Sequence, residues 1–404
     1  MYMKAVTPCV LTINAGSSSI RFAVYEASAP PRRLLDGKID RIGSSRPTLL
    51  VSDPAGSPPV AFQLAATDHR AAAAALMGWL EAQPIFASIK AVGHRVVHGM
   101  KHSEPVRVTP KLLAELHRIA SFVPEHLPRE IALIDALRRR HPRLPQVACF
   151  DTAFHRTMPA VARTLPIPRR YAAKGIERYG FHGLSYEYLM EELGRLDPQA
   201  AMGRVVLAHL GNGASMTAVH HGRSIDTSMG FTPAGGLVMG TRTGDVDPGL
   251  AYVLARTQRM TAARFQRMVN HESGLLGVSG TSSDVRDLLA REGSDVRAAN
   301  AVALFCYQAK KWIGTHAAAL GGLDTVVFAG GIGENAPLIR SRICAGLGFL
   351  GVALDERRNA ASAPLISRGT TRVKVRVIRT DEELMIARSV SRVLARIAPR
   401  GAKP

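Results

Sequence analysis

Short apolar runs rich in β-branched residues alternate along the chain with longer segments whose apolar residues recur every three or four positions. The first pattern predicts strands and the second predicts amphipathic helices, so we expect an α/β fold. The predicted strands are residues 10–14, 20–25, 91–97, 146–150, 205–210, 216–220, 325–329 and 373–378. The predicted helices are residues 111–121, 129–140, 298–319 and 382–397.

Two segments resemble each other, "INAGSSSIRFAV" (13–24) and "LGNGASMTAV" (210–219). Each reads as a strand, a turn containing Gly, Ser and Asn, and a second strand. Two related halves would produce this pattern, and so would two unrelated polar hairpins. The length of 404 residues is sufficient for two domains, each with its own core.

The net charge of +20, from 52 Lys and Arg against 32 Asp and Glu, would suit nucleic acid, an acidic surface or small anions as partners. The basic residues are scattered, without a long basic tract or an aromatic platform for a single strand. We therefore interpret the charge as a solvated basic surface and expect no nucleic-acid partner.

The cysteines, Cys9, Cys149, Cys306 and Cys344, lie far apart in apolar runs and form no Cys-x-x-Cys pair. This predicts buried thiols in a reducing compartment, with no disulfide or metal role. The longest run of small apolar residues, "AAAAALMGWL", is about half as long as a membrane-spanning helix. We therefore expect a soluble, cytoplasmic protein with no membrane partner.

Three Gly-rich segments each follow an apolar strand, and together they favour nucleotide binding. In "INAGSSS" the chain turns at Gly16 and exposes backbone N–H groups and the hydroxyls of Ser17 and Ser19, which can donate to phosphate oxygens. Arg21 adds a positive charge, although a plain β-hairpin explains the same residues. The other segments are "HLGNGASM" (209–216) and "FAGGIGENAP" (328–337).

In the third segment, the glycines would let the backbone approach a flat ligand, and Glu334 and Asn335 are expected to open the next helix. The first segment lacks the Lys-Ser or Lys-Thr ending of a Walker A loop, which disfavours a P-loop NTPase. Neither of the other two is a GxGxxG followed by the partner acid of a dinucleotide fold, which disfavours NAD binding.

Polar clusters occur at predicted strand ends, in "VGHRVVHG" (92–99), "CFDTAFH" (149–155), "RYGFHG" (178–183) and "MGTRTGDVDPG" (239–249). Arg95 and Arg242 are candidates for holding a carboxylate or a phosphate through the planar guanidinium. Asp151, directly after a strand, is either functional or a cap. Four histidines are either acid-base groups, metal ligands or structural residues, without the spacing of a zinc site: His98, His126, His155 and His182.

The segment "RTDEELMIARS" (379–389) places Asp381, Glu382 and Glu383 at the start of the last predicted helix. Negative charge is favourable at a helix N-terminus, which is one explanation. The other is a hard cation held by one carboxylate and water, since Mg²⁺ bound to ATP keeps several waters and takes few protein ligands.

The ordered set "INAGSSS", "GHRVVHG", "FDTAFH", "YGFHG", "HLGNG", "MGTRTGDVDPG", "SGTSSDVRD", "GIGEN" and "DEELMIAR" resembles the acetokinase family of short-chain carboxylate kinases over nearly the whole chain. The resemblance implies two ribonuclease-H-like domains of the sugar kinase, actin and Hsp70 superfold around a central cleft, and a homodimer. It also implies reversible transfer of the γ-phosphoryl group of ATP to acetate, giving acetyl phosphate and ADP, with Mg²⁺ or Mn²⁺. The expected domains are residues 1–151 plus 383–404, on the carboxylate and phosphate side, and residues 152–382, which bind the nucleotide.

The resemblance also implies a role for each matching residue. Asn14 and Glu382 match the metal-associated positions. The catalytic positions correspond to Arg95, His126, Asp151, His182 and Arg242. The substrate is held by Arg95 and by the apolar residues Val97, Phe181 and Pro233. The nucleotide-contacting positions correspond to Arg21, in place of the usual Lys, and to His209, Leu210, Gly211, Asn212, Gly213, Asp284, Val285, Arg286, Gly331, Ile332, Gly333, Glu334 and Asn335.

An acetate carboxylate is already a nucleophile at neutral pH, so we expect direct in-line transfer without a phosphoenzyme, in which Asp151 orients Arg95 or Arg242. The chain departs from the family pattern at Glu125 and Leu127, on either side of His126, where Leu and Asn are usual. Asp381 replaces Asn, and Met100 replaces Gly. These departures leave propionate or butyrate as alternative substrates. A non-catalytic, actin-like ATP-binding protein is the alternative from another class.

Overall fold

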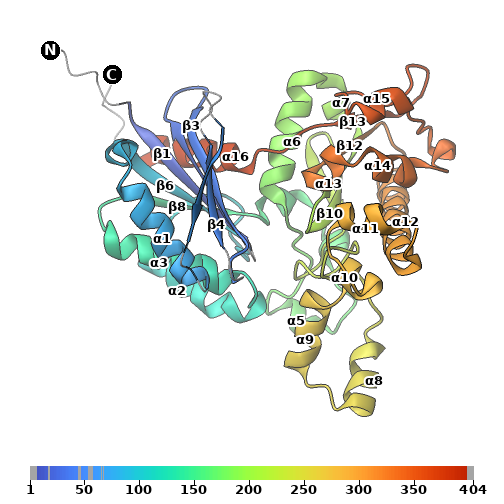
Figure 1. Ribbon diagram of the computed structural model, residues 1–404, viewed down its shortest axis with the longest axis horizontal. Coiled ribbons are helices and arrows are strands. Elements are labelled where there is room, and N and C mark those ends of the chain that lie inside the picture. The colour runs from blue at the N-terminus through green and yellow to red at the C-terminus, as the bar shows by residue number, and fades with distance from the viewer. Residues whose placement is uncertain are drawn as a thin grey trace. The chain divides into compact units, whose positions relative to one another are not determined.

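A computed structural model describes residues 7–16, 19–43, 47–52, 58–64, 66 and 68–397. The chain forms two compact units, divided between Ala153 and Phe154 and again between Thr380 and Asp381 (Figure 1). Unit 1 is the part up to Ala153 together with the part from Asp381 onwards, and unit 2 is the part between. Each division falls two residues from an expected domain boundary, 151/152 or 382/383.

Unit 1 is built on an eight-stranded sheet with the order β5-β4-β3-β2-β1-β6-β8-β7. Its strands are β1 (Cys9–Ala15), β2 (Ile20–Glu26), β3 (Arg32–Asp40), β4 (Thr48–Ser52), β5 (Val60–Gln63), β6 (Ile89–Val96), β7 (Val106–Arg107) and β8 (Gln146–Phe150). Its α-helices are α1 (His69–Glu81), α2 (Pro110–Ile119), α3 (Leu127–Arg140) and α16 (Glu382–Ile397).

Helices cover the sheet of unit 1. Helices α1 and α3 pack together and share one apolar core with β1, β2 and β6, in which Leu76 and Leu133 lie against the strands. The C-terminal helix α16 packs on β1 and β6. A Cβ atom at Gly93 of β6 would lie 2.4 Å from a methyl of Ile386 and 2.6 Å from a methyl of Val390, so the glycine allows α16 to approach this closely.

Unit 2 is built on a five-stranded sheet with the order β11-β10-β9-β12-β13. Its strands are β9 (Arg204–Leu210), β10 (Ala214–His220), β11 (Arg223–Thr227), β12 (Thr325–Ala329) and β13 (Lys374–Val377). Its α-helices are α4 (Ala160–Arg163), α5 (Arg169–Ala172), α6 (Gly183–Leu196), α7 (Pro198–Met202), α8 (Gly249–Gln258), α9 (Ala262–His271), α10 (Gly274–Ser279), α11 (Val285–Arg291), α12 (Val296–Ala319), α13 (Gly330–Asn335), α14 (Pro337–Cys344) and α15 (Glu356–Ala360).

Alternate residues of β9 are buried against different helices. Val205 and Leu207 share a core with Tyr186 and Leu189 of α6. Val206 and Ala208 are equally buried but point to the other face of the sheet, where the long helix α12 contacts β9, β10 and β11. The sheet of unit 2 is therefore buried on both faces, which explains the apolar runs Val205–Ala208 of β9 and Val326–Ala329 of β12.

The two sheets share one strand order. In unit 1, β3-β2-β1 is antiparallel and continues into the parallel strands β6 and β8. In unit 2, β11-β10-β9 is antiparallel and continues into the parallel strands β12 and β13. The two segments that resemble each other in sequence form the β1–β2 and β9–β10 hairpins. The internal repeat predicted from them is confirmed at the level of topology.

Every predicted strand and helix lies on an observed one, with ends that shift by a few residues. The pattern missed mixed or Ala-rich elements, notably β3, β4, α1 and α6. Strand β3 is half-buried along most of its length, so its alternation of apolar and polar residues is weak.

The third Gly-rich segment folds differently from the prediction. Gly330–Asn335 is itself helix α13, and the next helix begins at Pro337. Gly330 has a φ of 74°, so the chain turns from β12 directly into the helix. A Cβ atom at this position would lie 2.7 Å from the carbonyl oxygen of Leu210, which excludes other residues. Glu334 and Asn335 therefore end one helix and do not open the next.

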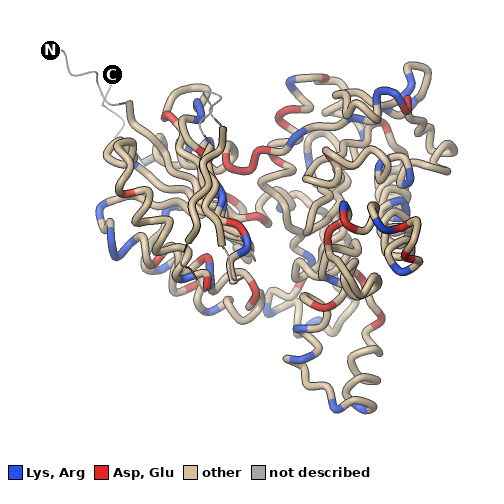
Figure 2. The backbone as a smooth tube through the Cα atoms, viewed as in Figure 1, with Lys and Arg blue, Asp and Glu red and all other residues tan. Residues whose placement is uncertain are grey.

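The cysteines and charged residues are distributed as the composition predicts. All four cysteines are buried thiols. Figure 2 shows Lys and Arg positions spread over both units and interspersed with Asp and Glu. Within the described ranges, no helix combines the length and apolar character needed to cross a membrane.

Candidate active site

Arg95 and Asp151 come together because neighbouring parallel strands end at the same edge of the sheet of unit 1. Arg95 of β6 pairs in register with Cys149 of β8, and Asp151 follows that strand. The backbone N–H of Asp151 donates to the carbonyl of Val96 at 2.9 Å. Arg95 Nη2 donates to Asp151 Oδ2 at 2.6 Å, and the aspartate side chain is fully buried. Its carboxylate thus fixes the direction of the guanidinium.

The other N–H donors of Arg95 have few hydrogen-bond acceptors in the described part of the chain. Its Nε is buried and has no hydrogen-bond acceptor there, and Nη1 lies 3.8 Å from Oε1 of Glu130. Burial lowers the pKa of Arg95, but the charges of Asp151, Glu382 and Glu130 outweigh burial and raise it above its ordinary value. Arg95 is therefore a fixed cation with unused donors, which suits an anionic ligand.

Val97 and His126 lie beside this pair in unit 1. Val97 follows β6 with its side chain buried, and its backbone N–H donates to Oε2 of Glu130 at 2.8 Å. His126 precedes α3, and its carbonyl accepts the backbone N–H of Glu130 at 3.2 Å. Glu130 therefore connects three of the predicted site residues.

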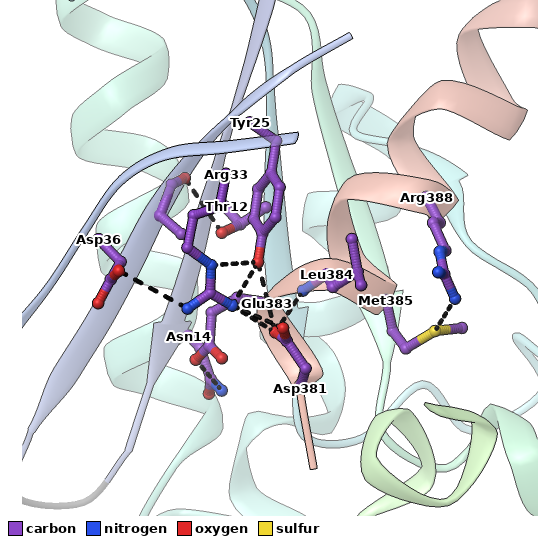
Figure 3. Close-up of polar contacts among 11 residues, drawn as sticks. Thr12, Asn14, Tyr25, Arg33, Asp36, Asp381, Glu383, Leu384, Met385 and Arg388 are labelled. Atoms are coloured by element: carbon purple, nitrogen blue, oxygen red, sulfur yellow. Dashed lines mark hydrogen bonds and ion pairs between the residues drawn. The ribbon is translucent and has the colours of Figure 1, made fainter. Parts of the chain in front are cut away.

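The start of α16 is a second polar cluster of unit 1 (Figure 3). Asn14 Nδ2 donates to Glu382 Oε2 at 2.7 Å and to Glu383 Oε1 at 3.2 Å. Asp381 accepts the backbone N–H of Leu384 at 3.0 Å, as a helix cap, and binds Arg33 at 2.7 Å. The favourable negative charge predicted at this helix start is confirmed for Asp381, whereas Glu382 turns toward Asn14.

The donor set at this cluster fits a hard divalent cation. Burial raises the pKa of Glu383, and the negative charge of Glu382 raises it further. The cluster has oxygen donors and an excess of negative charge, which Mg²⁺ prefers. No group of three His, Cys, Asp or Glu residues that could hold a metal occurs in the described part of the chain, so the protein alone supplies few ligands.

The first Gly-rich segment lies at the same end of unit 1. Arg21 pairs in register with Asn14 across the β1–β2 hairpin, and its charge acts on Glu383. Gly16 N–H donates to the carbonyl of Ser19 at 2.7 Å, which closes the turn. Ser17, predicted to face phosphate, lies outside the described residues.

In unit 2, His182 occupies a strained position before α6. Its φ of 58° places it in the left-handed region, which residues other than glycine rarely adopt. The Nδ1 atom lies 2.8 Å from Oγ of Ser215, which also contacts the hydroxyl of Tyr186. The ring stacks on His209 with centroids 4.3 Å apart. These contacts fix the ring and explain how the strain is tolerated.

Arg242 and His182 both lie against Gly213. A Cβ atom on Gly213 would be 3.2 Å from Arg242 Nη2 and 3.4 Å from His182 Nε2. Arg242 Nη1 donates to the carbonyl of Pro233 at 2.7 Å, which ties the arginine to a residue of the predicted apolar pocket. Two basic side chains thus meet at the glycine of the "HLGNG" turn.

The predicted nucleotide segments of unit 2 also meet there. Strands β9 and β12 are parallel neighbours, so the turns that follow them lie side by side. A Cβ atom at Gly211 would be 3.9 Å from Gly331 N. A Cβ atom at Gly240 would be 2.2 Å from Oδ1 of Asn212 and 3.2 Å from the carbonyl of Ser283. The segments 209–213 and 331–335 and the residue before Asp284 are therefore neighbours.

Several contacts of these segments are structural. Glu334 Oε1 accepts the N–H groups of Gly330 at 2.9 Å and Thr380 at 3.1 Å. Asn335 Nδ2 donates to the carbonyl of Gly331 at 2.9 Å. Asp284 caps α11 and pairs with the exposed Arg286 at 2.6 Å. Val285 is buried, as are Leu210 and Gly333.

The sequence model of the acetokinase family matches residues 9–388. The chain belongs to the acetokinase family. It is 47% identical over 392 residues to the acetate kinase of Rhodopseudomonas palustris, covering 95% of this chain and 98% of that protein.

Solved structures agree with this assignment. The acetate kinase of Porphyromonas gingivalis is 35% identical, with a TM-score of 0.84 over 96% of this chain and 100% of that one. A propionate kinase of Francisella tularensis is also 35% identical, with a TM-score of 0.88 over 95% of this chain and 98% of that one. The two units of this acetokinase-family chain are therefore ribonuclease-H-like domains of the actin-like sugar kinase superfold.

The site residues predicted for this acetokinase-family chain divide between the units. Unit 1 contains Asn14, Arg21, Arg95, Val97, His126, Asp151 and Glu382. Unit 2 contains Phe181, His182, Pro233, Arg242 and the nucleotide segments. Phe181 is buried, and its carbonyl accepts a hydrogen bond from His155 at 3.0 Å, so His155 has a structural role.

Glu130 contacts the predicted site residues Arg95 and Val97, and sequence reasoning missed it. Its side chain is only 2% exposed, and burial raises its pKa to about 8 against the lowering effect of Arg95. The signal was present in α3, whose buried residues include Leu127, Ile131 and Ile134. Glu130 falls on this apolar face, where a carboxyl group is rare unless it has partners.

Proposed function

We propose that the protein is an acetate kinase that transfers the γ-phosphoryl group of ATP reversibly to acetate, giving acetyl phosphate and ADP. The observation that carries this proposal is Arg95, a mostly buried guanidinium that is oriented by Asp151 and whose Nε has no hydrogen-bond acceptor in the described part of the chain. Such a group suits the carboxylate that accepts the phosphoryl group. The identity to the acetate kinase of Rhodopseudomonas palustris supports acetate as the acceptor.

The chemistry needs alignment and charge stabilisation more than a base. An acetate carboxylate attacks phosphorus without losing a proton, so the residues must bring two anions together and stabilise charge on the transferring group. Asp151 is engaged by Arg95 and acts by orienting it. We infer direct in-line transfer, which inverts configuration at a chiral γ-phosphate. Retention would indicate a phosphoenzyme and contradict this mechanism.

Unit 2 would supply the nucleotide side of the reaction, and unit 1 the carboxylate side. The turns after β9 and β12 bring glycines and backbone amides together. Arg242 and His182, which meet at Gly213, are suited to donate to the transferring phosphoryl group. The stacked ring of His209 and the contact with Ser215 hold His182 in place.

Asn14 and Glu382 would hold Mg²⁺, in agreement with the donor set at the start of α16. The cation would neutralise phosphate oxygens of ATP when bound. Arg33 and Asp381 keep the helix start next to β1 and β2, so that Glu382 stays beside Asn14.

A kinetic series tests the acceptor. ADP release with Mg-ATP is measured for acetate, propionate and butyrate, and we expect the highest kcat/KM for acetate. One methylene changes kcat/KM by about 10 to 200-fold in a fitted pocket. A kcat/KM much higher for propionate than for acetate would instead make the protein a propionate kinase, like the Francisella tularensis protein. ATP binding without turnover of any acid would favour a non-catalytic ATP-binding protein.

Gly213→Ala is expected to lower kcat/KM by about 10 to 100-fold, because the added methyl would press on Arg242 and His182, and small displacements in an active site cost this much. Gly213 does not have a positive φ, so alanine fits the backbone without strain. The control is Gly314→Ala in α12, where the methyl meets open space. Equal kcat/KM for both variants would contradict the placement of Arg242 and His182.

We further propose a cytoplasmic homodimer. The buried thiols agree with a reducing compartment. No residue of α8 is buried, and it exposes Tyr252 by 70% and Val253 by 51%, which supports an apolar contact with a second copy. Light scattering should give twice 43.4 kDa, and Tyr252→Glu should halve that mass. A wild-type protein that scatters as a monomer would refute the dimer.

A further inference from the structure

Glu130 is a buried acid whose cationic partner among the described residues, Arg95, is bound more closely by Asp151. Its Oε2 accepts the backbone N–H of Val97 at 2.8 Å. Its Oε1 is buried, has no hydrogen-bond partner among the described residues, and lies 3.8 Å from Arg95 Nη1. The closer partner of Arg95 is Asp151, at 2.6 Å. Glu130 is thus the second and looser of two carboxyl groups around one guanidinium.

Charge counting makes this arrangement unusual for a site that receives an anion. If Glu130 is ionised, the single positive charge of Arg95 faces two buried negative charges, and Glu382 of α16 acts on the same guanidinium. A substrate carboxylate would add one more negative charge. Buried excess charge is costly, so the site binds an anion better when one of its own carboxyl groups is neutral.

We propose that Glu130 is a positioning residue that holds Arg95 and the Val97 backbone, and that in its ionised form it competes with the carboxylate substrate for Arg95. The inference rests on the proposed function and adds a control of substrate binding by pH. The charged groups around Glu130 are Arg95 of β6 and Asp151 after β8, and the carbonyl of His126, which precedes α3, accepts the backbone N–H of Glu130. Burial raises the pKa of Glu130 to about 8, which keeps the neutral form dominant at neutral pH.

The test compares the wild type with Glu130→Gln. Glutamine has nearly the same volume and still accepts the Val97 N–H, but it does not ionise. The KM for acetate should rise about tenfold between pH 7 and pH 9 in the wild type, because one pH unit above a pKa leaves about a tenth of the neutral form. In Glu130→Gln it should change less than about twofold, and the KM for ATP should be equal in both proteins.

The matched control is Glu104→Gln, which neutralises an exposed carboxylate of unit 1 that is paired with Arg396. The KM of Glu104→Gln for acetate should equal that of the wild type at every pH. A wild-type KM for acetate that stays flat from pH 7 to pH 9 overturns the proposal without any variant. Parallel rises in the wild type and in Glu130→Gln overturn it as well.

A second readout does not depend on substrate. The carboxyl of Glu130 ionises near its ordinary pKa of 4.5 in the unfolded chain but only near 8 in the folded one, so rising pH favours unfolding over this range. From pH 5 to pH 8, the urea midpoint of Glu130→Gln should therefore rise relative to the urea midpoint of the wild type. A difference between the two urea midpoints that stays the same from pH 5 to pH 8 contradicts the inference. Failure of the proposed function would instead leave a wild type that phosphorylates no acid.

Discussion

Arg95→Ala is expected to lower kcat/KM for acetate by about 10³-fold, because removal of one fixed donor to a developing charge costs about 10² to 10³ and we propose that this residue also holds the acceptor. The loss of kcat/KM in Asp151→Asn should be about tenfold smaller than in Arg95→Ala, since the guanidinium remains but loses its charged partner. Arg95→Lys should not restore activity, because an ammonium cannot reproduce the planar fork that reaches Asp151 and extends toward Glu130. Initial rates at saturating Mg-ATP measure all three variants.

The control for this series is Arg396→Ala, which removes an exposed arginine of unit 1 from its pair with Glu104. Its kcat/KM should equal that of the wild type. Circular dichroism on each variant establishes that the unit is folded, because Arg95→Ala leaves Asp151 buried without its cation. A folded Arg95→Lys with wild-type kinetics would refute the role assigned to the guanidinium.

Arg340→Met is expected to give the largest loss of stability, on the order of 4 kcal/mol. Arg340 of α14 is fully buried and donates to the carbonyls of Gly333, Glu334 and Asn359, to Oδ1 of Asn359 and to Oγ of Ser362. Methionine leaves these buried acceptors unbonded, at about 1 to 3 kcal/mol each before relaxation. Because Gly333 and Glu334 belong to α13, the KM for ATP should rise too.

The matched control lies two residues further along the same helix. Arg342 pairs with Glu292 at 2.7 Å in a partly exposed position, and such pairs contribute about 1 kcal/mol or less. Urea unfolding of both methionine variants gives the comparison. A loss for Arg340→Met no larger than that for Arg342→Met would mean that the buried network contributes little to stability.

The elements that the apolar pattern predicted are those whose burial is one-sided or complete. Strands β1, β9 and β12 are short apolar runs, and α16 carries apolar residues at helical spacing, so each could be predicted from the sequence. Helix α1 was not predicted, because its run of alanines has no clear apolar face. Helix α13 was read as a loop, since three of its six residues are glycines, and Gly330 needs β12 and Leu210 around it to turn as it does.

The candidate site was predicted where a residue acts through its own type and place at a strand end. Arg95 and Asp151 are such residues, and the structure joins them. Glu130 escaped because its importance lies in contacts with Arg95 and Val97, more than thirty positions away. That pairing depends on α3 packing on β6, which a single sequence does not display.

The place of α16 has a consequence for how the protein is made. This helix contains the last described residues of the chain, yet it fills the space above Gly93 in the first unit. During synthesis, all of unit 2 must leave the ribosome before the sheet of unit 1 receives its C-terminal helix. The half of the molecule that is synthesised first is therefore completed last, and the Asn14–Glu382 pair forms only at that final step.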